Sequence, residues 1–159
     1  MPENTTHTGP AEVNDDLVGR FLSFYVGDSL YALELLYVKE IISMQQITLV
    51  PTLPAYIKGI INLRGKVVPV IDVRRKLNQP DLDYNDKTCI IITQIDEMQV
   101  GLIVDSVAEV VSSSQSEKML PPDMSIMGEN YIHSIMHLND KKVVLCLDCD
   151  KFFAADLKM

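Results

Sequence analysis

Short runs of β-branched and aromatic residues, separated by polar pairs, recur along the chain from Phe21 onward. Runs of this kind, closed by turns that contain Gly, Asp or Asn, are typical of β-hairpins. The pattern predicts hairpins over residues 21–35, 57–73, 88–104 and 131–147, with turns at Gly27-Asp28, Arg64-Gly65, Asp96-Glu97 and Asn139-Asp140. Strands therefore dominate the predicted secondary structure.

Several predicted strands are apolar on both faces, as in Ile90-Ile91-Ile92 and Val67-Val68. A single exposed sheet would leave one such face in water, whereas a closed barrel, or two barrels packed together, buries both. Roughly ten short strands at intervals near 8 to 12 residues also favour small barrels. The predicted fold class is mostly β.

Three segments are compatible with short helices. Leu36 to Ser43 has the apolar spacing of a short amphipathic helix, and Arg74 to Asn78 and Cys149 to Ala155 could each supply a turn or two. The polar stretch from Asn78 to Lys87 lies in the middle of the chain, and we interpret it as the crossing between two halves. No sequence repeat is strong enough to demonstrate a duplication.

Composition limits the classes of partner. Residues 1–18 contain almost no apolar side chains, so we predict a flexible tail there and one domain over residues 19–159. The net charge of -8 argues against nucleic acid and acidic membranes as partners. No apolar stretch reaches the roughly 18 to 20 residues that span a bilayer, and the 3 cysteines occur without an export signal. These features favour the cytoplasm.

Cys146 and Cys149 have the C-x-x-C spacing of redox and zinc sites, with His133 and His137 just upstream. Residues four apart on a strand are separated by about 13 Å, too far for both imidazoles to reach one ion easily. We therefore expect no metal and interpret Cys146 as a small buried hydrophobe. A small thiol or metal protein remains the rival class.

Sequence motifs of enzymes are absent: the chain has no G-x-S-x-G, no phosphate-binding loop of the G-x-x-x-x-G-K-[ST] type and no G-x-G-x-x-G. The carboxylate pairs at Asp81 and Asp83 and at Asp148 and Asp150 have no His nearby in sequence, and neither pair suggests a tuned acid and base. We expect a protein without catalysis and without a cofactor.

The segment from Lys58 to Asp72, KGIINLRGKVVPVID, is the most informative part of the chain. An arginine held at a hairpin turn presents five N–H donors, which suits backbone carbonyls or carboxylates on another protein. The alternative is that Arg64 is simply a solvated turn residue. Pro69 inside a strand favours an edge or a bulge, which would expose part of this hairpin.

At this point the sequence resembles the CheW-type coupling proteins of bacterial chemotaxis. The resemblance covers about residues 20–155 and rests on FLSFYVGDSLYALELLYVKEI, YIKGIINLRGKVVPVIDVR, GLIVDSVAEVV and HLNDKKVVLCLDCDKFF, in that order. It implies two small, intertwined, five-stranded SH3-like β-barrels around a shared hydrophobic core, with a few short helices. It also implies a non-catalytic adaptor that links the cytoplasmic tips of chemoreceptors, the methyl-accepting chemotaxis proteins, to the regulatory domain of the histidine kinase CheA.

The same resemblance implies the position of the receptor site. The receptor helix is expected to dock in an apolar groove between the barrels, which Arg64 borders. Matching positions on or beside that surface are Val38, Glu40, Lys58, Gly59 and Asn62. At 159 residues, neither the remainder of a kinase nor the receiver of CheV fits the chain, so a stand-alone coupler at receptor arrays is the closer match. An adaptor of another chemosensory pathway, in motility or gene control, stays open.

The segment from Met119 to Met127 matches no motif. It combines Met119, Leu120 and Met124 with two prolines between strand runs, which predicts exposed apolar contacts for the kinase regulatory domain. The alternative is a loop folded over the second barrel to close its core. The closing run also departs from the aliphatic pattern of the family, because Cys146, Cys149 and Phe152 stand there.

Overall fold

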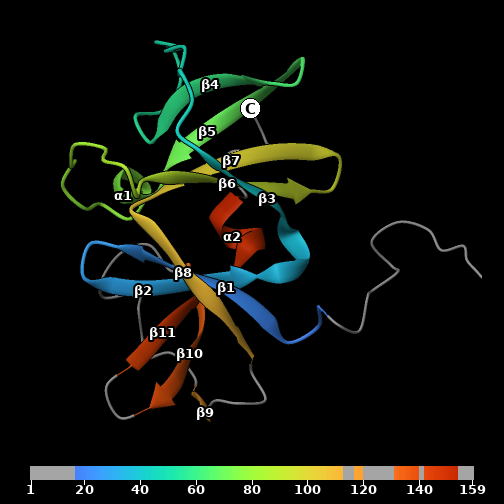
Figure 1. The fold of residues 1–159 in the computed structure, drawn as a ribbon, viewed down its shortest axis with the longest axis vertical. Helices are drawn as coiled ribbons and strands as arrows, with labels where there is room; N and C mark the ends of the chain where they lie inside the picture. The colour runs from blue at the N-terminus through green and yellow to red at the C-terminus, as the bar shows by residue number, and fades with distance from the viewer. Residues whose placement is uncertain (1–16, 113–116, 120–130, 140–141, 154–159) are drawn as a thin grey trace, which may run out of the picture.

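The strands of the protein form two sheets, one in each half of the molecule (Figure 1). The structure is a computed structural model and describes residues 17–112, 117–119, 131–139 and 142–153. The strands are β1 (Arg20–Val26), β2 (Ser29–Glu34), β3 (Val38–Ser43), β4 (Ile57–Leu63), β5 (Lys66–Asp72), β6 (Cys89–Ile95), β7 (Met98–Val104), β8 (Ser106–Ser112), β9 (Glu117–Met119), β10 (Ile132–Asn139) and β11 (Lys142–Leu147). The helices are η3 (Leu35–Tyr37), α1 (Val73–Lys76) and α2 (Cys149–Phe153).

Both sheets are built in the same way. Within the described residues, the strand orders are β8-β1-β2-β11-β10-β9 and β3-β6-β7-β5-β4. Each sheet has one parallel pair, in which Ala32 faces Cys146 between β2 and β11 and Gly101 faces Val70 between β7 and β5. In the six-stranded sheet, Met119 of β9 pairs with Ile135 of β10. In the five-stranded sheet, an isolated bridge between Thr48 and Ile60 occupies the equivalent position. The predicted mostly-β fold of two small barrel-like sheets is confirmed, with β9 as an added sixth strand.

This likeness is also present as a sequence repeat, which the sequence alone does not reveal. YIKGIINL over residues 56–63 corresponds to YIHSIMHL over residues 131–138, and a Lys-Val-Val run begins both β5 and β11. Asp72 ends β5 and Asp148 directly follows β11, and their N–H groups donate to the carbonyls of Tyr56 and Tyr131 at 2.8 and 2.7 Å. Identical residues at structurally equivalent places indicate that the second half of the chain repeats the first.

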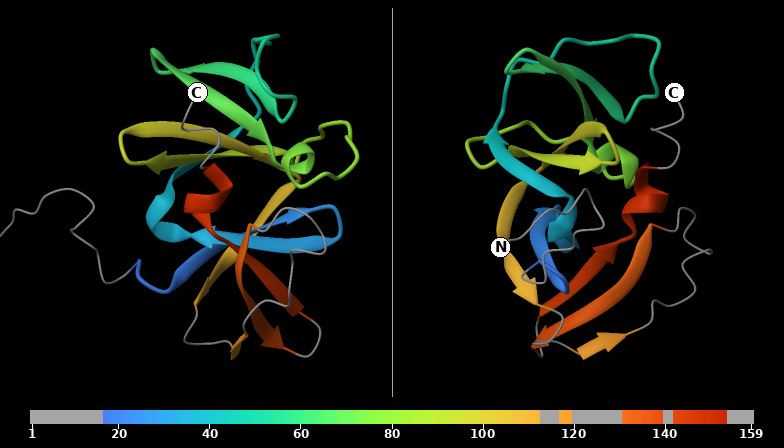
Figure 2. Two further views of the ribbon diagram at one scale, coloured as in Figure 1. Left: turned by 180° about the vertical axis from the view of Figure 1, so that it is seen from behind. Right: turned by 90° about the vertical axis from the view of Figure 1, so that its right-hand side faces the viewer.

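The two repeats exchange their first hairpins. The hairpin of β1 and β2 lies in the sheet of β8 to β11, whereas the hairpin of β6 and β7 lies in the sheet of β3 to β5. The chain therefore crosses between sheets at η3 and again at Asp105, between β7 and β8 (Figure 2). Residues 78–87, predicted as the crossing between two halves, join the two sequence repeats, but they connect α1 to β6 without passing from one sheet to the other.

Apolar side chains fill three clusters. One cluster lies inside the six-stranded sheet and contains Met136, and a second lies inside the five-stranded sheet and contains Ile92. The largest cluster lies between the sheets and includes Leu33, Ile91 and Phe152. The Nζ atom of buried Lys76 lies over aromatic rings of this shared region, 4.4 Å from the centroid of Tyr56, 5.5 Å from Tyr131 and 5.1 Å from Phe152. The expected shared hydrophobic core is present and joins the two sheets.

The predicted hairpins are confirmed, and so are short helices after β5 and β11, but the helix predicted over residues 36–43 is wrong. Only Leu35–Tyr37 forms a single 3-10 turn, and Val38–Ser43 forms β3, which pairs with β6. Burial alternates along β3, but the apolar residues do not follow it, since Glu40 is partly buried and Ile41 is 45% exposed, so the apolar spacing of this segment imitates a helix. Among the described residues, none of the helices is long and apolar enough to cross a membrane.

Candidate functional site

Arg64 lies in a tight turn that presents its side chain to solvent. Leu63 pairs with Lys66, which leaves a two-residue loop, and both loop residues have positive φ, 52° at Arg64 and 86° at Gly65. These angles are those of a type I′ turn, the two-residue loop that matches the twist of the strands. Asn62 supports the turn, because its Oδ1 atom accepts a hydrogen bond of 2.9 Å from the N–H of Gly65. The Arg64 side chain is 67% exposed.

Glu40 on β3 forms an ion pair with Arg64, donated by the Nη2 atom of the arginine. β3 and β4 are the two edge strands of the five-stranded sheet, so this pair spans the line where the sheet closes on itself. Farther along the same line, the backbones of Thr48 and Ile60 exchange two hydrogen bonds of 2.9 Å. The structure thus brings two of the expected receptor residues together and gives the exposed Arg64 a partner.

Gly59 allows this closure. A Cβ atom at residue 59 would lie 2.2 Å from the carbonyl oxygen of Thr48, which is closer than any real contact. On one side, Pro69 faces Ile60 of β4, whose N–H and C=O groups are bonded to Thr48. On the other side, the described pairing of β5 with β7 begins only at Val70. Pro69 therefore lies at a position with a neighbour on one side only, as predicted for a proline in a strand.

Lys58 contacts a different group of residues from Arg64. Its Nζ atom lies 5.6 Å from the ring centroid of Tyr84, whose hydroxyl donates a 3.0 Å hydrogen bond to Oδ2 of buried Asp72. Burial and the charge of Asp72 raise the pKa of Tyr84 well above its usual range. Lys58 therefore borders the stretch between α1 and β6, and its place beside the receptor site remains a prediction.

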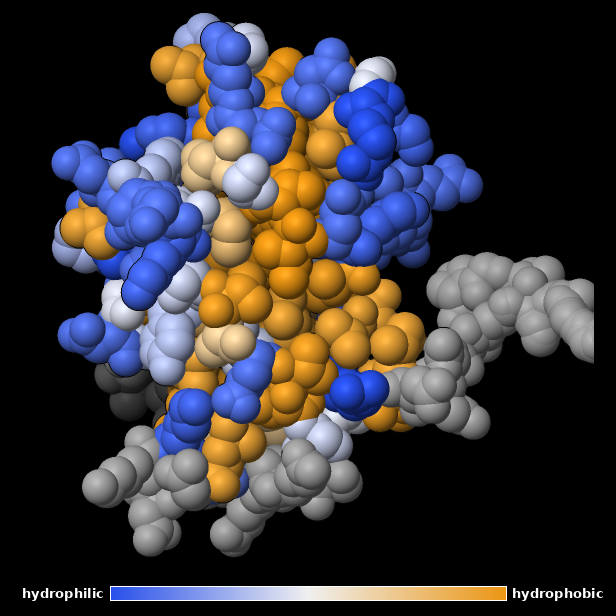
Figure 3. All heavy atoms as spheres, viewed as in Figure 1, coloured by the Kyte–Doolittle hydropathy of each residue, from blue (hydrophilic) through white to orange (hydrophobic). Residues whose placement is uncertain are grey.

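Apolar residues gather in a band along one face of the molecule, over parts of both sheets (Figure 3). Val38 on β3 and Val107 on β8 are partly buried against the cluster between the sheets, and Ile41 and Val110 on the same strands are 45% and 41% exposed. The sequence predicts a role in receptor binding for Val38 but for none of the β8 residues. The missing signal was the repeat, in which YVKEI over residues 37–41 corresponds to SVAEV over residues 106–110.

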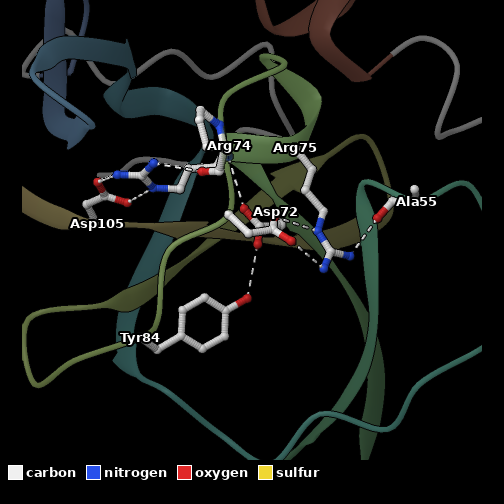
Figure 4. A network of polar contacts seen from close by, with 8 residues as sticks. Ala55, Asp72, Arg74, Arg75, Tyr84 and Asp105 are labelled. Atoms are coloured by element: carbon white, nitrogen blue, oxygen red, sulfur yellow. Dashed lines mark hydrogen bonds and ion pairs between the residues drawn. The ribbon is translucent and has the colours of Figure 1, made fainter.

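Arg74 joins the two halves through Asp105 (Figure 4). Its Nε and Nη2 atoms donate hydrogen bonds of 2.8 and 2.6 Å to the two carboxylate oxygens of Asp105, which also accepts 2.8 Å from the N–H of Gly27. Burial alone would raise the pKa of Asp105, but the hydrogen bonds from Arg74 and Gly27 outweigh it and hold the pKa below its usual value. Arg75 makes a similar paired contact with Asp81, at 3.0 and 3.2 Å.

The cysteines lie in settings that disfavour thiolate chemistry. Cys146 is fully buried in the six-stranded sheet, and burial, with the charge of Glu34 as a smaller cause, raises the pKa of Cys149 to about 12. Over the described residues, no group of three or more His, Cys, Asp and Glu side chains is arranged to hold a metal ion. A thiol with a raised pKa is a poor nucleophile and a poor zinc ligand at neutral pH.

Most of the residues predicted to face the kinase lie outside the part of the chain that the structure describes. The backbone of Met119 ends β9 and pairs with Ile135 on β10. Leu120 and Met124 lie outside the described residues, as does the predicted tail up to residue 16.

Comparison with known proteins agrees with this architecture. The model of the CheW-like domain matches residues 20–157, so the chain belongs to the family of CheW-like domains. The chain is 30% identical to the chemotaxis protein CheW of Treponema pallidum over 92% of this chain and 88% of that protein. It is 40% identical to the chemotaxis protein CheW of Bacillus subtilis over 65% and 67% of the two chains. Its structure resembles the crystal structure of the scaffolding protein TtCheW from Thermoanaerobacter tengcongensis, with a TM-score of 0.72, 30% identity, and coverage of 82% and 88%.

Proposed function

We propose that this protein is a non-catalytic chemotaxis adaptor that couples the cytoplasmic tips of chemoreceptors to the kinase CheA. Membership of the CheW-like family supports the general role of a scaffold. The observation that carries the receptor part is the exposed Arg64, held by Glu40 on β3, the strand that also carries the exposed Ile41. An apolar band extends over both sheets (Figure 3). An apolar groove with a charged margin suits an amphipathic helix, because its apolar face is buried while its flanking polar groups pair with the margin.

In this proposal the guanidinium of Arg64 contacts carbonyl or carboxylate groups of the docked receptor helix. Exposed ion pairs contribute at most about 1 kcal/mol to stability, so Arg64 can leave Glu40 at little cost. Val38 supplies an apolar contact, and Gly59 and Asn62 act indirectly, since they fix the sheet closure and the turn. Lys58 contributes a second cation near the same hairpin.

Coupling requires a second face for the kinase. The described pairing of β5 with β7 begins at Val70 and Gly101, so the starts of these strands leave a hollow lined by Lys66, Met98 and their neighbours. Val67 and Met98 expose 68% and 42% of their surface at this hollow. Exposed apolar residues on a rigid strand suit a stable contact with another protein domain. Met119, Leu120 and Met124 remain a separate prediction for the kinase contact.

Co-sedimentation tests the proposal. Purified protein is mixed with receptor-containing membranes and the kinase, and kinase activity is read in the same tube. We expect activity to rise only when all three components are present. Met98→Ser should lower kinase co-sedimentation several-fold while receptor binding stays unchanged. A wild-type protein that binds neither partner would contradict the proposal.

The same surfaces would serve an adaptor of another chemosensory pathway. Receptors from different pathways, compared in the same assay, separate this alternative from the chemotaxis role.

A further inference from the structure

The edge strands β3 and β8 are counterparts in the internal repeat. Each pairs with the first strand of an exchanged hairpin, β3 with β6 and β8 with β1. Val38 faces Thr93, and Val107 faces Phe24, which corresponds to Thr93 in the repeat. Each ladder has a register shift next to this pair. Val107 on β8 is therefore structurally equivalent to Val38 on β3.

By the same correspondence, Glu109 has the place of Glu40. Glu40 faces Ile92, whose counterpart is Ser23. The Ser23 hydroxyl donates 2.6 Å to the carbonyl of Glu109 and accepts 3.1 Å from its N–H group, which places Glu109 opposite Ser23 at the bulge. The two glutamates thus occupy equivalent positions on the two edge strands.

Both glutamates pair with a cation from the hairpin that closes their sheet. Glu40 pairs with Arg64 at the turn before β5, and Glu109 pairs with the Nζ atom of Lys142, the first residue of β11, at 3.5 Å. The Lys142 side chain is 36% exposed and that of Glu109 54%. The second pair is therefore open to solvent, as the first one is.

The two pairs lie at opposite sides of one surface. β3 and β8 lie on the same side of the molecule, away from α1 and α2, and the β4–β5 and β10–β11 hairpins lie at its two ends (Figures 1 and 2). The apolar band of Figure 3 runs between these ends. A helix laid along the band would thus meet one acid–base pair near each end.

We propose that Lys142, held by Glu109, is a second charged contact for the receptor helix. It has the role at one end of the groove that Arg64 has at the other, although in the repeat Lys142 corresponds to Lys66. This inference rests on the proposed function. The partner that fits is a helix with an apolar stripe and a carboxylate near each end, one for the planar guanidinium of Arg64 and one for the ammonium of Lys142. Contacts at both ends fix the position of the helix along the groove, which an apolar stripe alone leaves free to slide.

The test is the affinity for a soluble cytoplasmic fragment of a chemoreceptor, measured with a thermal melt for every variant. We expect Lys142→Glu to weaken binding about 10-fold or more at low salt and Lys142→Arg to bind like the wild type. Lys87→Glu is the matched control, because it makes the same charge change on an exposed loop residue. All variants should melt like the wild type, since exposed ion pairs stabilise little.

A charge swap separates direct contact from support. The double variant Glu109→Lys, Lys142→Glu restores the internal pair but places the wrong charge at residue 142, and we expect it to bind as weakly as Lys142→Glu alone. Wild-type affinity in the swap, or in Lys142→Glu, would overturn the inference. Loss of kinase binding without loss of receptor binding would also overturn it. If the wild type itself fails to bind the fragment, the proposed function fails instead.

Discussion

Arg64 occupies a backbone conformation that arginine rarely adopts. A side chain at φ 52° brings Cβ close to the following carbonyl, which costs about 1–2 kcal/mol relative to right-handed conformations. Glycine and asparagine fit such a turn better. Residues held in unfavourable backbone conformations concentrate at functional sites, and the ion pair with Glu40 is too exposed to compensate fully. The conformation supports a role for Arg64 in binding.

Two substitutions at residue 64 separate backbone strain from recognition. Arg64→Ala keeps the backbone strain, whereas Arg64→Asn relieves part of it. The asparagine variant should therefore be more stable than the alanine variant by about 0.5–1 kcal/mol. Both should lose receptor-dependent kinase activation, because a charged hydrogen bond is worth roughly 1.5–3 kcal/mol, or about 10-fold or more in affinity. Arg64→Lys should rescue only partly.

Urea unfolding and the coupled kinase assay are the measurements. Full activation by either Arg64→Ala or Arg64→Asn would exclude Arg64 from the receptor contact. A large loss of stability in Arg64→Ala would instead show that Arg64 has a structural role.

At the scale of elements, Asp105 connects three of them. It lies between β7 and β8, binds Arg74 of α1 and accepts from Gly27 in the turn between β1 and β2. These contacts span the two sheets at the point where the chain crosses. The Asp105 network therefore holds the relative position of the halves, and with it the two sides of the apolar band.

This network makes stability depend on pH. The pKa of Asp105 is lowered on folding, so its contribution is complete above the unfolded value of about 3.9 and is lost as pH falls through the folded pKa. We expect Asp105→Asn to reduce stability by about 1–3 kcal/mol at pH 7. The difference from the wild type should be equal at pH 7 and pH 5 and should shrink as the pH falls below about 4.

Urea unfolding of both proteins at pH 7, 5, 4 and 3 measures this difference, and Asp96→Asn, at an exposed turn, is the control. A difference that stays constant with pH would show that the charge of Asp105 is not what stabilises the crossing.

For the whole molecule, the exchange of hairpins makes each half depend on the other. A fragment of residues 1–86 contains β1 to β5 but lacks the strands β6 and β7 that lie in the middle of the five-stranded sheet. Residues 87–159 likewise lack β1 and β2. We expect each fragment alone to be unfolded and an equimolar mixture to regain β-structure, because only the mixture restores both sheets and the shared core.

Far-UV circular dichroism and thermal melts of the separate and mixed fragments test this expectation. A cooperative melt of either fragment alone would show that a half folds independently, and no gain on mixing would show that the covalent connection is required.

Local features of the sequence determined the hairpins and their turns. Alternation of side chains and the residues at Gly27 and Gly65 act within a few residues, so the sequence predicts them without a tertiary structure. The exposed turn position of Arg64 follows from the same local reasoning, and the motifs around it were specific enough to predict the family. The segment of β3 failed as a prediction because its apolar residues do not follow the alternation of its burial and its partner strand lies about 50 residues away.

Tertiary structure alone decided which of these residues meet. Glu40 and Arg64 are 24 residues apart, and Glu109 and Lys142 are 33 apart. They pair only because each sheet closes on itself once a hairpin of the other repeat is inserted between its edge strand and its own hairpin. No local pattern encodes such a contact, since closure depends on the packing of strands that are distant in sequence. The sequence therefore determined the hairpins and the turn that presents Arg64, whereas the closure of the two sheets determined the acid–base pairs.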